Sequence, residues 1–340
     1  MLDLSLNYVH HQQLSSFYVG LELLDLFTTT KSSFDFGLTK GKTLPILSGR
    51  FNDFSFYLDC LDGYNWIEGD MQQNLGYFAS NLKHDIVVKR NFTDEFIGLV
   101  PGRKVIHFGF NYPMGYRLPF VPWIKLLQQN PYWAIKYRHL LRGYYDFRTF
   151  EYLPVAPDPM RILYQVRLWD PGSARDSASR EQRRQMNAFR VDCVRALLEN
   201  FPTQAVAGVE DSDFSRALCP DLVISREVTS RNSYFKLIRQ CAIGVTSNGL
   251  HQSIGWKMGE YIASSRAIVC ERPYFLFPPH FLEGQNYLGF STPEELVIQV
   301  DNLLSKPDKL SAMMQENQNY YQEYQRPDRL VWHILRQMEL

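Results

Sequence analysis

The chain has 340 residues, of which 45% are hydrophobic and 14% aromatic, and this composition excludes an intrinsically disordered protein. Lys and Arg number 36 together, as do Asp and Glu, so the chain lacks the excess of positive charge that is typical of nucleic-acid-binding proteins. A chain of this length exceeds what one hydrophobic core usually supports, and two domains are expected.

Cysteines and apolar segments give further exclusions. The five cysteines form no CxxC pair and accompany no histidine cluster, which argues against a disulfide framework or a zinc site. The N-terminal residues lack the pattern of a signal peptide, and no apolar run approaches the roughly 18 residues of a membrane span. These features predict a cytoplasmic protein with reduced thiols.

The first part of the chain alternates between strand-like and helix-like segments. The alternation predicts an α/β domain. Strands are predicted at residues 2–9, 52–61, 84–90 and 103–110, and a helix at residues 13–27.

The segment 120–150 interleaves tryptophan and tyrosine with lysine and arginine. Aromatic residues at helical spacing usually fill a core, and packing is the preferred interpretation. The alternative is peripheral contact with an anionic membrane surface, near a lipid-linked substrate at the inner face of the membrane.

A proline-rich linker follows. Pro154, Pro157 and Pro159 make residues 153–160 unsuitable for a helix or a strand, so the boundary is placed at residue 156 and the domains at 1–156 and 157–340. The second domain again alternates. Strands are predicted at 161–169, 204–209 and 241–246, and helices at 179–200, 230–240 and 326–338.

Residues 247–269 form the most informative segment, because a polar loop, a helix and a short apolar strand follow one another there. With the strand at 241–246 they make a βαβ unit, whose ligands collect at the carboxyl ends of the strands. Gln252 and Glu260 are separated by seven residues and lie about two helical turns apart, on nearly the same face.

This spacing resembles the donor-site motif of group 1 glycosyltransferases with the GT-B fold, in which an acidic residue and a glutamate are separated by seven residues. The second glycine and the second glutamate of the motif match Gly255 and Glu260, whereas Gln252 replaces the first acidic residue. Gln252 can still donate and accept hydrogen bonds, but it carries no charge, so the choice of donor is expected to differ. The resemblance extends from Arg161 to Arg336. This part of the chain is similar to the C-terminal half of bacterial group 1 enzymes from polysaccharide gene clusters.

The resemblance implies a set of donor-binding residues. Glu260 would bind the nucleotide ribose, and Gln252 the transferred sugar. Backbone N–H groups of Ser253, Ile254 and Gly255 would face the phosphates at a helix N-terminus, where the dipole favours an anion.

Two arginines are candidates for the diphosphate. Arg167 follows the strand at 161–169, and Arg175 is the nearest match to a second basic residue of the family. Their forked, permanent charge suits phosphate oxygens, although surface arginines are often only solvated. Electrostatic stabilisation of this kind would replace a metal.

Catalytic groups are expected from the first domain. His11 follows the first strand, where related enzymes often carry a histidine or an aspartate, and Asp62 lies in a second loop. Histidine titrates near neutrality and suits a general base, but a turn explains either residue as well.

Asp211 and Asp213 resemble the metal-binding pair of another glycosyltransferase fold, but a helix cap explains them better, and no metal or cofactor is expected. The resemblance implies two Rossmann-like domains that face a central cleft, with a C-terminal helix that crosses back to the first domain. The first domain would bind the acceptor and the second the nucleotide-sugar donor.

The predicted activity is metal-independent transfer of a hexosyl or related group from a nucleotide diphosphate sugar to a hydroxyl of a glycan or lipid-linked glycan. The pathway would be cell-surface polysaccharide or lipopolysaccharide synthesis. The alternatives are a degenerate scaffold that binds glycan or a partner enzyme, and a nucleotide-sugar epimerase or phosphosugar transferase of the same fold.

Overall fold

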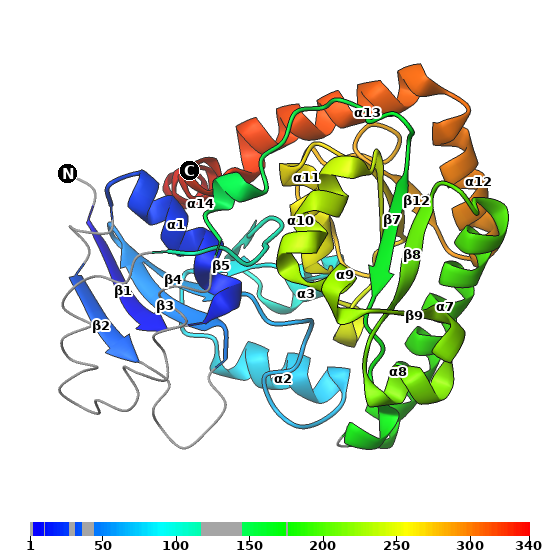
Figure 1. Cartoon of the computed structure of the whole chain (residues 1–340). Helices are drawn as coiled ribbons and strands as arrows, with labels where there is room; N and C mark the ends of the chain where they lie inside the picture. Colours follow the sequence, from blue (N-terminus) through cyan, green and yellow to red (C-terminus); the bar gives the residue numbers. More distant parts are fainter. Residues whose placement is uncertain (1–2, 10, 27–30, 36–43, 117–144, 175) are drawn as a thin grey trace, which may run out of the picture. The chain divides into compact units, whose positions relative to one another are not determined.

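The computed structural model describes residues 3–9, 11–26, 31–35, 44–116, 145–174 and 176–340. The chain forms two compact units (Figure 1). Unit 1 comprises Met1–Thr149, Tyr274–Pro279 and Gln322–Leu340, and unit 2 comprises Phe150–Pro273 and His280–Tyr321.

The division differs from a single boundary at residue 156. The chain changes unit after Thr149, and two later segments return to unit 1; the apolar side chains of the C-terminal one pack into its core rather than into that of unit 2. A single boundary along the chain cannot describe a unit that is built from three separate segments.

Unit 2 contains one sheet in the order β12-β11-β10-β7-β8-β9, and its strand pairs are all parallel. In chain order this is the Rossmann arrangement 3-2-1-4-5-6, read from β9, and it confirms the predicted α/β class. The strands are β7 (Ile162–Val166), β8 (Ala205–Glu210), β9 (Val223–Ile224), β10 (Ile243–Thr246), β11 (Ala267–Glu271) and β12 (Leu288–Phe290). The helices are α7 (Ser177–Asn200), α8 (Asp213–Leu218), α9 (Arg226–Thr229), α10 (Arg231–Gln240), α11 (Trp256–Ala263), α12 (Pro293–Leu304) and α13 (Pro307–Tyr320).

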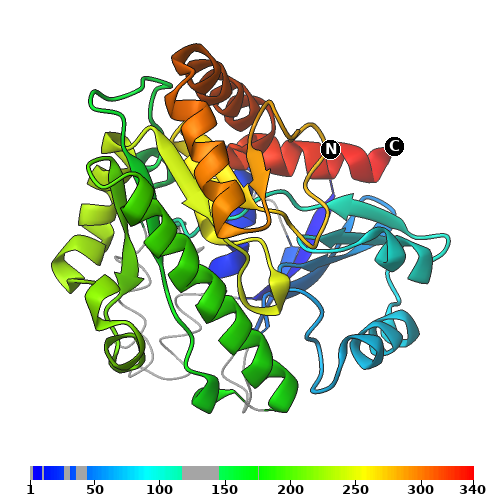
Figure 2. The same ribbon diagram turned by 90° about the vertical axis from the view of Figure 1, so that its right-hand side faces the viewer.

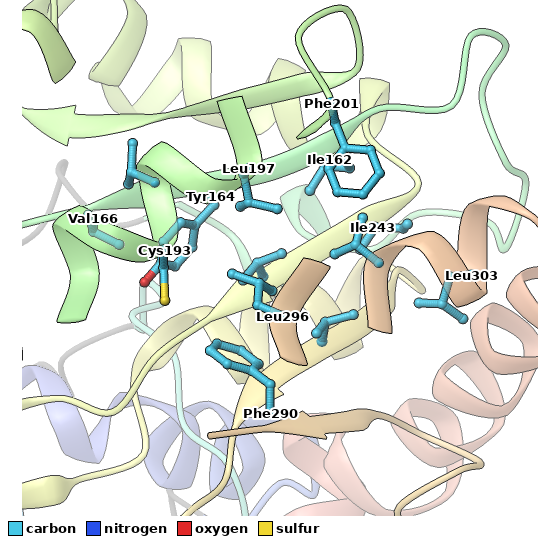
Figure 3. Packing of buried hydrophobic residues seen from close by; sticks show 14 of the residues in the cluster. Ile162, Tyr164, Val166, Cys193, Leu197, Phe201, Ile243, Phe290, Leu296 and Leu303 are labelled. Atoms are coloured by element: carbon cyan, nitrogen blue, oxygen red, sulfur yellow. The ribbon is translucent and has the colours of Figure 1, made fainter. Parts of the chain in front are cut away.

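The sheet of unit 2 is covered on both faces, which explains why its strands are almost continuously apolar. Alternate residues of β7 and β10, such as Tyr164 and Ile243, pack against Cys193 and Leu197 of α7 and Leu296 of α12 (Figure 3). Figure 2 shows α7 and α12 lying across the strands, next to each other. The other face of the sheet receives α11.

Glycine permits this second contact. A Cβ atom on Gly244 of β10 would lie 2.5 Å from the ring of Tyr261, which is fully buried on α11. The absence of a side chain at this position therefore lets α11 approach the sheet closely.

Unit 1 contains a mixed sheet in the order β2-β1-β3-β4-β5-β6, in which β3 alone is antiparallel to its neighbours among the described strands. The carboxyl ends of β1, β4, β5 and β6 therefore lie at the same edge. The strands are β1 (Leu4–Val9), β2 (Lys31–Asp35), β3 (Ile46–Phe51), β4 (Phe54–Asp59), β5 (Ile86–Lys89) and β6 (Lys104–His107). The helices are α1 (Ser15–Leu23), α2 (Met71–Asn81), α3 (Asp94–Leu99) and α14 (Pro327–Glu339).

The C-terminal helix α14 belongs to unit 1, as the predicted return to the first domain requires. Its apolar face, which includes Leu330, Val331 and Ile334, is buried in the core of this unit. A Cβ atom on Gly20 of α1 would lie 2.2 Å from the carbonyl oxygen of Pro327, so the two helices are in close backbone contact.

No helix within the described parts of the chain is long and apolar enough to cross a membrane. Most of the aromatic and basic segment 120–150 lies outside the described residues, so the membrane-contact interpretation stays a prediction.

Candidate functional site

The topology of unit 2 identifies a ligand-binding edge. Strands β7 and β10 pair with each other, while the strands that follow them in the chain lie on opposite sides. At such a switch point the loops after the two strands diverge, and ligands bind in the crevice outside their carboxyl ends. Arg167 follows β7, and Ser247 and Asn248 follow β10.

The loop after β10 has an unusual backbone. A short 3₁₀ turn, Leu250–Gln252, contains His251 and Gln252 at φ 56° and 59°, in the left-handed region that residues other than glycine rarely adopt. Both side chains are exposed. Local strain of this type is concentrated at functional sites.

The predicted helix of this corner is α11, which begins after Gly255 and has eight residues. No side chain caps its N-terminus. The three residues proposed to present backbone N–H groups differ: Ser253 already donates its N–H to the carbonyl of Leu250, at 3.2 Å, and Ile254 is buried. Gly255, at the N-cap, best fits the predicted anion-facing role.

Glu260 lies on α11 and is only 2% exposed. Its Oε1 accepts a hydrogen bond from Nη2 of Arg231, at 2.7 Å, and the two side chains form an ion pair. Its Oε2 has no hydrogen-bond partner among the described residues. A buried carboxylate oxygen without a donor is costly, and this indicates a group that a ligand would complete.

The hydroxyl of Tyr234 has the same property. It is buried and makes no hydrogen bond of good geometry with a described residue, although it lies near the side chains of Glu260 and Tyr261 and interacts with both. Burial raises the pKa of Tyr234, and the negative charge of Glu260 adds to this effect, so the hydroxyl keeps its proton. A ligand hydroxyl could therefore accept from Tyr234 and donate to Glu260.

Cations and aromatic rings surround this carboxylate. The guanidinium of Arg231 lies 5.2 to 5.6 Å from the ring centroids of Phe150, Tyr234 and Phe235. The Lys257 ammonium lies 4.2 Å from the Tyr234 ring. Burial lowers the pKa of Lys257 to about 8; the Glu260 carboxylate opposes the shift and Arg231 adds to it.

Arg167 is exposed at the end of β7, and its guanidinium stacks over the ring of Trp169 at 4.5 Å. No hydrogen bond or ion pair from its guanidinium to a described residue is present. The geometry therefore leaves its charge accessible to a ligand. Arg175 lies outside the described residues.

Sequence reasoning missed the residues that hold these loops. Arg190 of α7 donates to the carbonyl oxygens of Arg167 and Asn248, both at 2.6 Å, and to Oγ of Ser247 at 3.2 Å. Asn248 also donates its N–H to Glu271 at the end of β11, at 2.8 Å, and burial raises the pKa of this carboxyl group. An arginine inside an amphipathic helix gives no sequence signal for such a role.

Unit 1 gathers a second polar cluster at the carboxyl edge of its sheet. Gln13 connects the two predicted catalytic residues: its N–H donates to Nδ1 of His11, at 3.2 Å, and its Nε2 donates to Oδ1 of Asp62, also at 3.2 Å. His11 thereby caps the 3₁₀ turn Gln12–Leu14, and Asp62 is half-buried.

Two residues that were not predicted complete the cluster. Arg90, after β5, is buried and forms an ion pair with Asp62; its Nη1 donates to Oδ1 of Asn111, at 2.6 Å. Asn111 in turn donates to the carbonyl oxygen of Gln13, at 2.9 Å. The loops after β1, β4, β5 and β6 are therefore linked by side-chain hydrogen bonds.

Below this cluster lies a fully buried ion pair. Lys89 Nζ donates to Oδ2 of Asp59, at 2.9 Å, and the same oxygen accepts from Nε1 of Trp66, at 2.8 Å. Burial lowers the pKa of Lys89, and the adjacent carboxylate opposes this shift. Asp59 precedes the loop that carries Asp62, and it accepts hydrogen bonds from Leu61 and Trp66 within that loop.

The aspartates at 211 and 213 have a structural explanation. Asp211 forms ion pairs with Arg216 and Arg226, and Asp213 with Arg216. The capping residue of α8 is Ser212, between them. Within the described ranges, no cluster of three His, Cys, Asp or Glu residues could hold a metal ion.

The two clusters differ in chemistry. The edge of unit 2 combines accessible positive charge, an uncapped helix N-terminus and a buried hydroxyl-accepting oxygen, which suits a ligand with phosphates and hydroxyl groups. The edge of unit 1 presents a carboxylate and an imidazole that are held by fixed hydrogen bonds, which suits proton transfer or hydroxyl binding.

No protein-family model and no curated protein matches the chain. Solved structures similar to it include the C-terminal domain of LpcC, a group 1 family glycosyl transferase from Francisella tularensis, with 13% identity over 52% of this chain and 96% of that one and a TM-score of 0.35. Anabaena HepE in complex with UDP has 15% identity over 84% and 71%, with a TM-score of 0.46. Sucrose-phosphate synthase from Thermosynechococcus elongatus has 9% identity over 97% and 72%, with a TM-score of 0.49. All three similarities are remote.

Proposed function

We propose that the chain is a glycosyltransferase of the GT-B type that transfers a sugar from a nucleotide diphosphate sugar to a hydroxyl group. The observation that carries this proposal is the buried Oε2 of Glu260, which lacks a donor, on the helix that follows the Rossmann switch point. A ribose hydroxyl of the nucleotide would donate to it. The ion pair with Arg231 orients the carboxylate for this contact.

The diphosphate of the donor would lie between Arg167 and the N-terminus of α11. Arg167 offers an exposed guanidinium, and Gly255 begins a helix whose dipole favours an anion. Lys257, in the first turn of the same helix, adds a second cationic side chain. These groups would stabilise the negative charge that develops on the departing diphosphate, so that neither a metal nor another cofactor is needed.

The hydrogen bonds of unit 1 favour Asp62 over His11 as the proton acceptor. A backbone N–H only donates, so Nδ1 of His11 must present its lone pair to Gln13, and the neutral ring carries its proton on Nε2. Asp62 uses Oδ1 for Gln13 and Arg90, and its other oxygen would accept the hydroxyl proton.

For the acceptor we propose a glycan or a lipid-linked glycan of a cell-surface polysaccharide pathway, with the enzyme in the cytoplasm at the inner face of the membrane. Support comes from the resemblance of residues 247–269 to the group 1 motif and from the aromatic and basic composition of residues 120–150.

The test is a thermal-shift screen against UDP, GDP, dTDP, CDP, ADP and CMP, because a ligand that binds the native state raises its apparent stability. We expect the nucleotides of one base to raise the melting temperature of the wild type. In Glu260→Gln, which keeps a hydrogen-bond acceptor for Arg231 but removes the charge, the affinity for that nucleotide should fall at least about tenfold. If the bound nucleotide is a ribonucleotide, its 2′-deoxy form should bind less tightly than the ribose form, and in the wild type only. Unchanged affinity in folded Glu260→Gln would disprove the donor-site assignment.

A scaffold without activity is the second candidate, and two observations favour it. Gln252 is exposed and neutral where the motif has an acidic residue, and Arg231 already neutralises Glu260. Such a protein would show no shift with any nucleotide while still binding glycan. Formation of a free sugar epimer in place of a glycoside would instead indicate the epimerase alternative.

A further inference from the structure

Arg190 occupies an unusual environment at the switch point of unit 2. It is 7% exposed and forms no ion pair with a described residue, although the carboxylate of Glu271 is close enough to interact with its charge. Burying a guanidinium costs several kcal/mol unless its donors are well used. All three groups of the fork are used: Nη1 and Nη2 each donate to a carbonyl oxygen at 2.6 Å, and Nε to Oγ of Ser247 at 3.2 Å.

The acceptors of Arg190 belong to two different loops. Arg167 follows β7, whereas Ser247 and Asn248 follow β10, and these are the two strands on either side of the switch point. One planar, rigid group therefore bridges the two loops and fixes their separation there. Lysine could not do this, because a single ammonium lacks the forked geometry.

Asn187, one turn earlier on α7, extends the same support. Its Oδ1 accepts from the N–H of Trp169, at 3.0 Å, and its Nδ2 donates to the carbonyl of Trp169, at 2.8 Å. The backbone is thus held at both Arg167 and Trp169, whose side chains stack on each other. The hydrogen bonds from α7 to the backbone at Arg167 and Trp169 therefore orient the exposed guanidinium of Arg167.

We infer that Arg190 is a positioning residue for the donor diphosphate: it sets the spacing of the two loops, orients Arg167 and adds a buried positive charge beneath the phosphate position. This inference rests on the proposed function and refines it. The nucleoside is held elsewhere, by Glu260 on α11. The contribution of Arg190 should therefore be confined to the phosphates.

The experiment separates the two parts of the ligand. Uridine, UMP and UDP, and the matching series of guanosine, cytidine and adenosine, are titrated calorimetrically into the wild type and Arg190→Lys. We expect the affinity of the bound diphosphate to fall at least about tenfold in Arg190→Lys, while that of its nucleoside changes less than about twofold. The matched control is Arg184→Lys, at an exposed position of the same helix, which should leave both affinities unchanged.

Three outcomes would count against the inference. If the wild type binds a nucleoside diphosphate and Arg190→Lys binds it with the same affinity, the inference is overturned and the proposed function stays intact. An equal loss of nucleoside and diphosphate affinity would show a merely structural role. Absence of nucleotide binding in the wild type would overturn the proposed function as well.

If Arg190→Lys does not fold, the same titrations with Asn187→Ala and Ser247→Ala test the inference. Each of these variants removes only some of the hydrogen bonds that hold the two loops. Both should lower the ratio of diphosphate to nucleoside affinity, Asn187→Ala more strongly. Unchanged ratios in both variants would reject the inference.

Discussion

Charged side chains that are buried and held by hydrogen bonds recur at both strand-end clusters. In unit 2, Arg190 and Glu260 are buried and each contacts the loops or helices of the candidate donor site. In unit 1, Lys89 and Arg90 do the same for the loop that carries Asp62. Removing one member of the fully buried Lys89–Asp59 pair would leave an uncompensated charge and cost about 3 to 5 kcal/mol. The pairs of Arg90 and Glu260 have a partly exposed partner and contribute less.

His107 provides a residue-scale prediction about pH. Its Nδ1 accepts from the N–H of Gly109, at 2.9 Å, and its Nε2 donates to the carbonyl of Leu276, at 3.0 Å. Burial lowers its pKa to about 4. Between that value and the ordinary pKa of about 6.5, the unfolded chain binds more protons, so stability is full above about pH 6.5 and falls as the pH approaches 4.

Urea unfolding of the wild type and His107→Gln at a series of pH values checks this. Between pH 6.5 and 4, the free energy of unfolding of the wild type should fall by up to about 3 kcal/mol more than that of the variant. Parallel pH profiles for the two proteins would contradict the assignment of a neutral, buried ring.

How far the sequence predicted the site depends on where each residue lies. Glu260 was predicted from its seven-residue separation from Gln252 and the motif that this resembles, and Arg167 from its place after an apolar strand. The structure places both in segments that follow strands of one sheet. Arg190 and Arg90 were not, because their function depends on carbonyl and amide groups that are distant in sequence. Local patterns contain no information about such partners.

At the scale of elements, strongly periodic segments were predicted well. The strands β1, β7, β8 and β10 and the helices α7 and α10 lie where apolar spacing placed them. The prediction omitted β3, α2 and α13, since their burial is one-sided or interrupted by polar residues. Tertiary packing, rather than local preference, determines these elements.

The contact between α1 and α14 yields an element-scale prediction. Alanine at Gly20 would place its Cβ 2.2 Å from a backbone oxygen of Pro327 and 2.3 Å from Cγ2 of Val331. Although alanine favours a helix, the clash should dominate and Gly20→Ala should destabilise the protein by about 1 to 3 kcal/mol.

The matched control is Gly76→Ala in α2, where an added Cβ would meet nothing within 4 Å. Helix propensity alone acts there, so this variant should be more stable by up to about 1 kcal/mol. The midpoints of urea unfolding measure both effects. Similar midpoints for the two variants would show that α14 can move away from α1 at little cost.

At the scale of the whole molecule, each unit has its own core, and the core of unit 1 includes the C-terminal helix. Truncation after Tyr321 removes Leu330, Val331 and Ile334 from this core but no residue from the core of unit 2. We therefore expect unit 1 to lose its cooperative structure while unit 2 remains folded.

Hydrogen exchange followed by mass spectrometry distinguishes the units. Peptides from β1 and α1 should exchange rapidly in the truncated protein, and peptides from β7 and α7 should stay protected. Deletion of Leu340 alone, a residue that is 89% exposed, is the control and should change neither. Persistent protection of β1 after the truncation would show that α14 is dispensable for unit 1.

The discontinuity of unit 1 has a consequence for synthesis on the ribosome. Its first 149 residues emerge early, yet the helix α14 of its core is made only after the whole of unit 2. An N-terminal domain ordinarily folds while the rest of the chain is still being made. Here the nascent first unit must keep an apolar surface uncovered until α14 has emerged, and this makes it a substrate for chaperones that bind growing polypeptides.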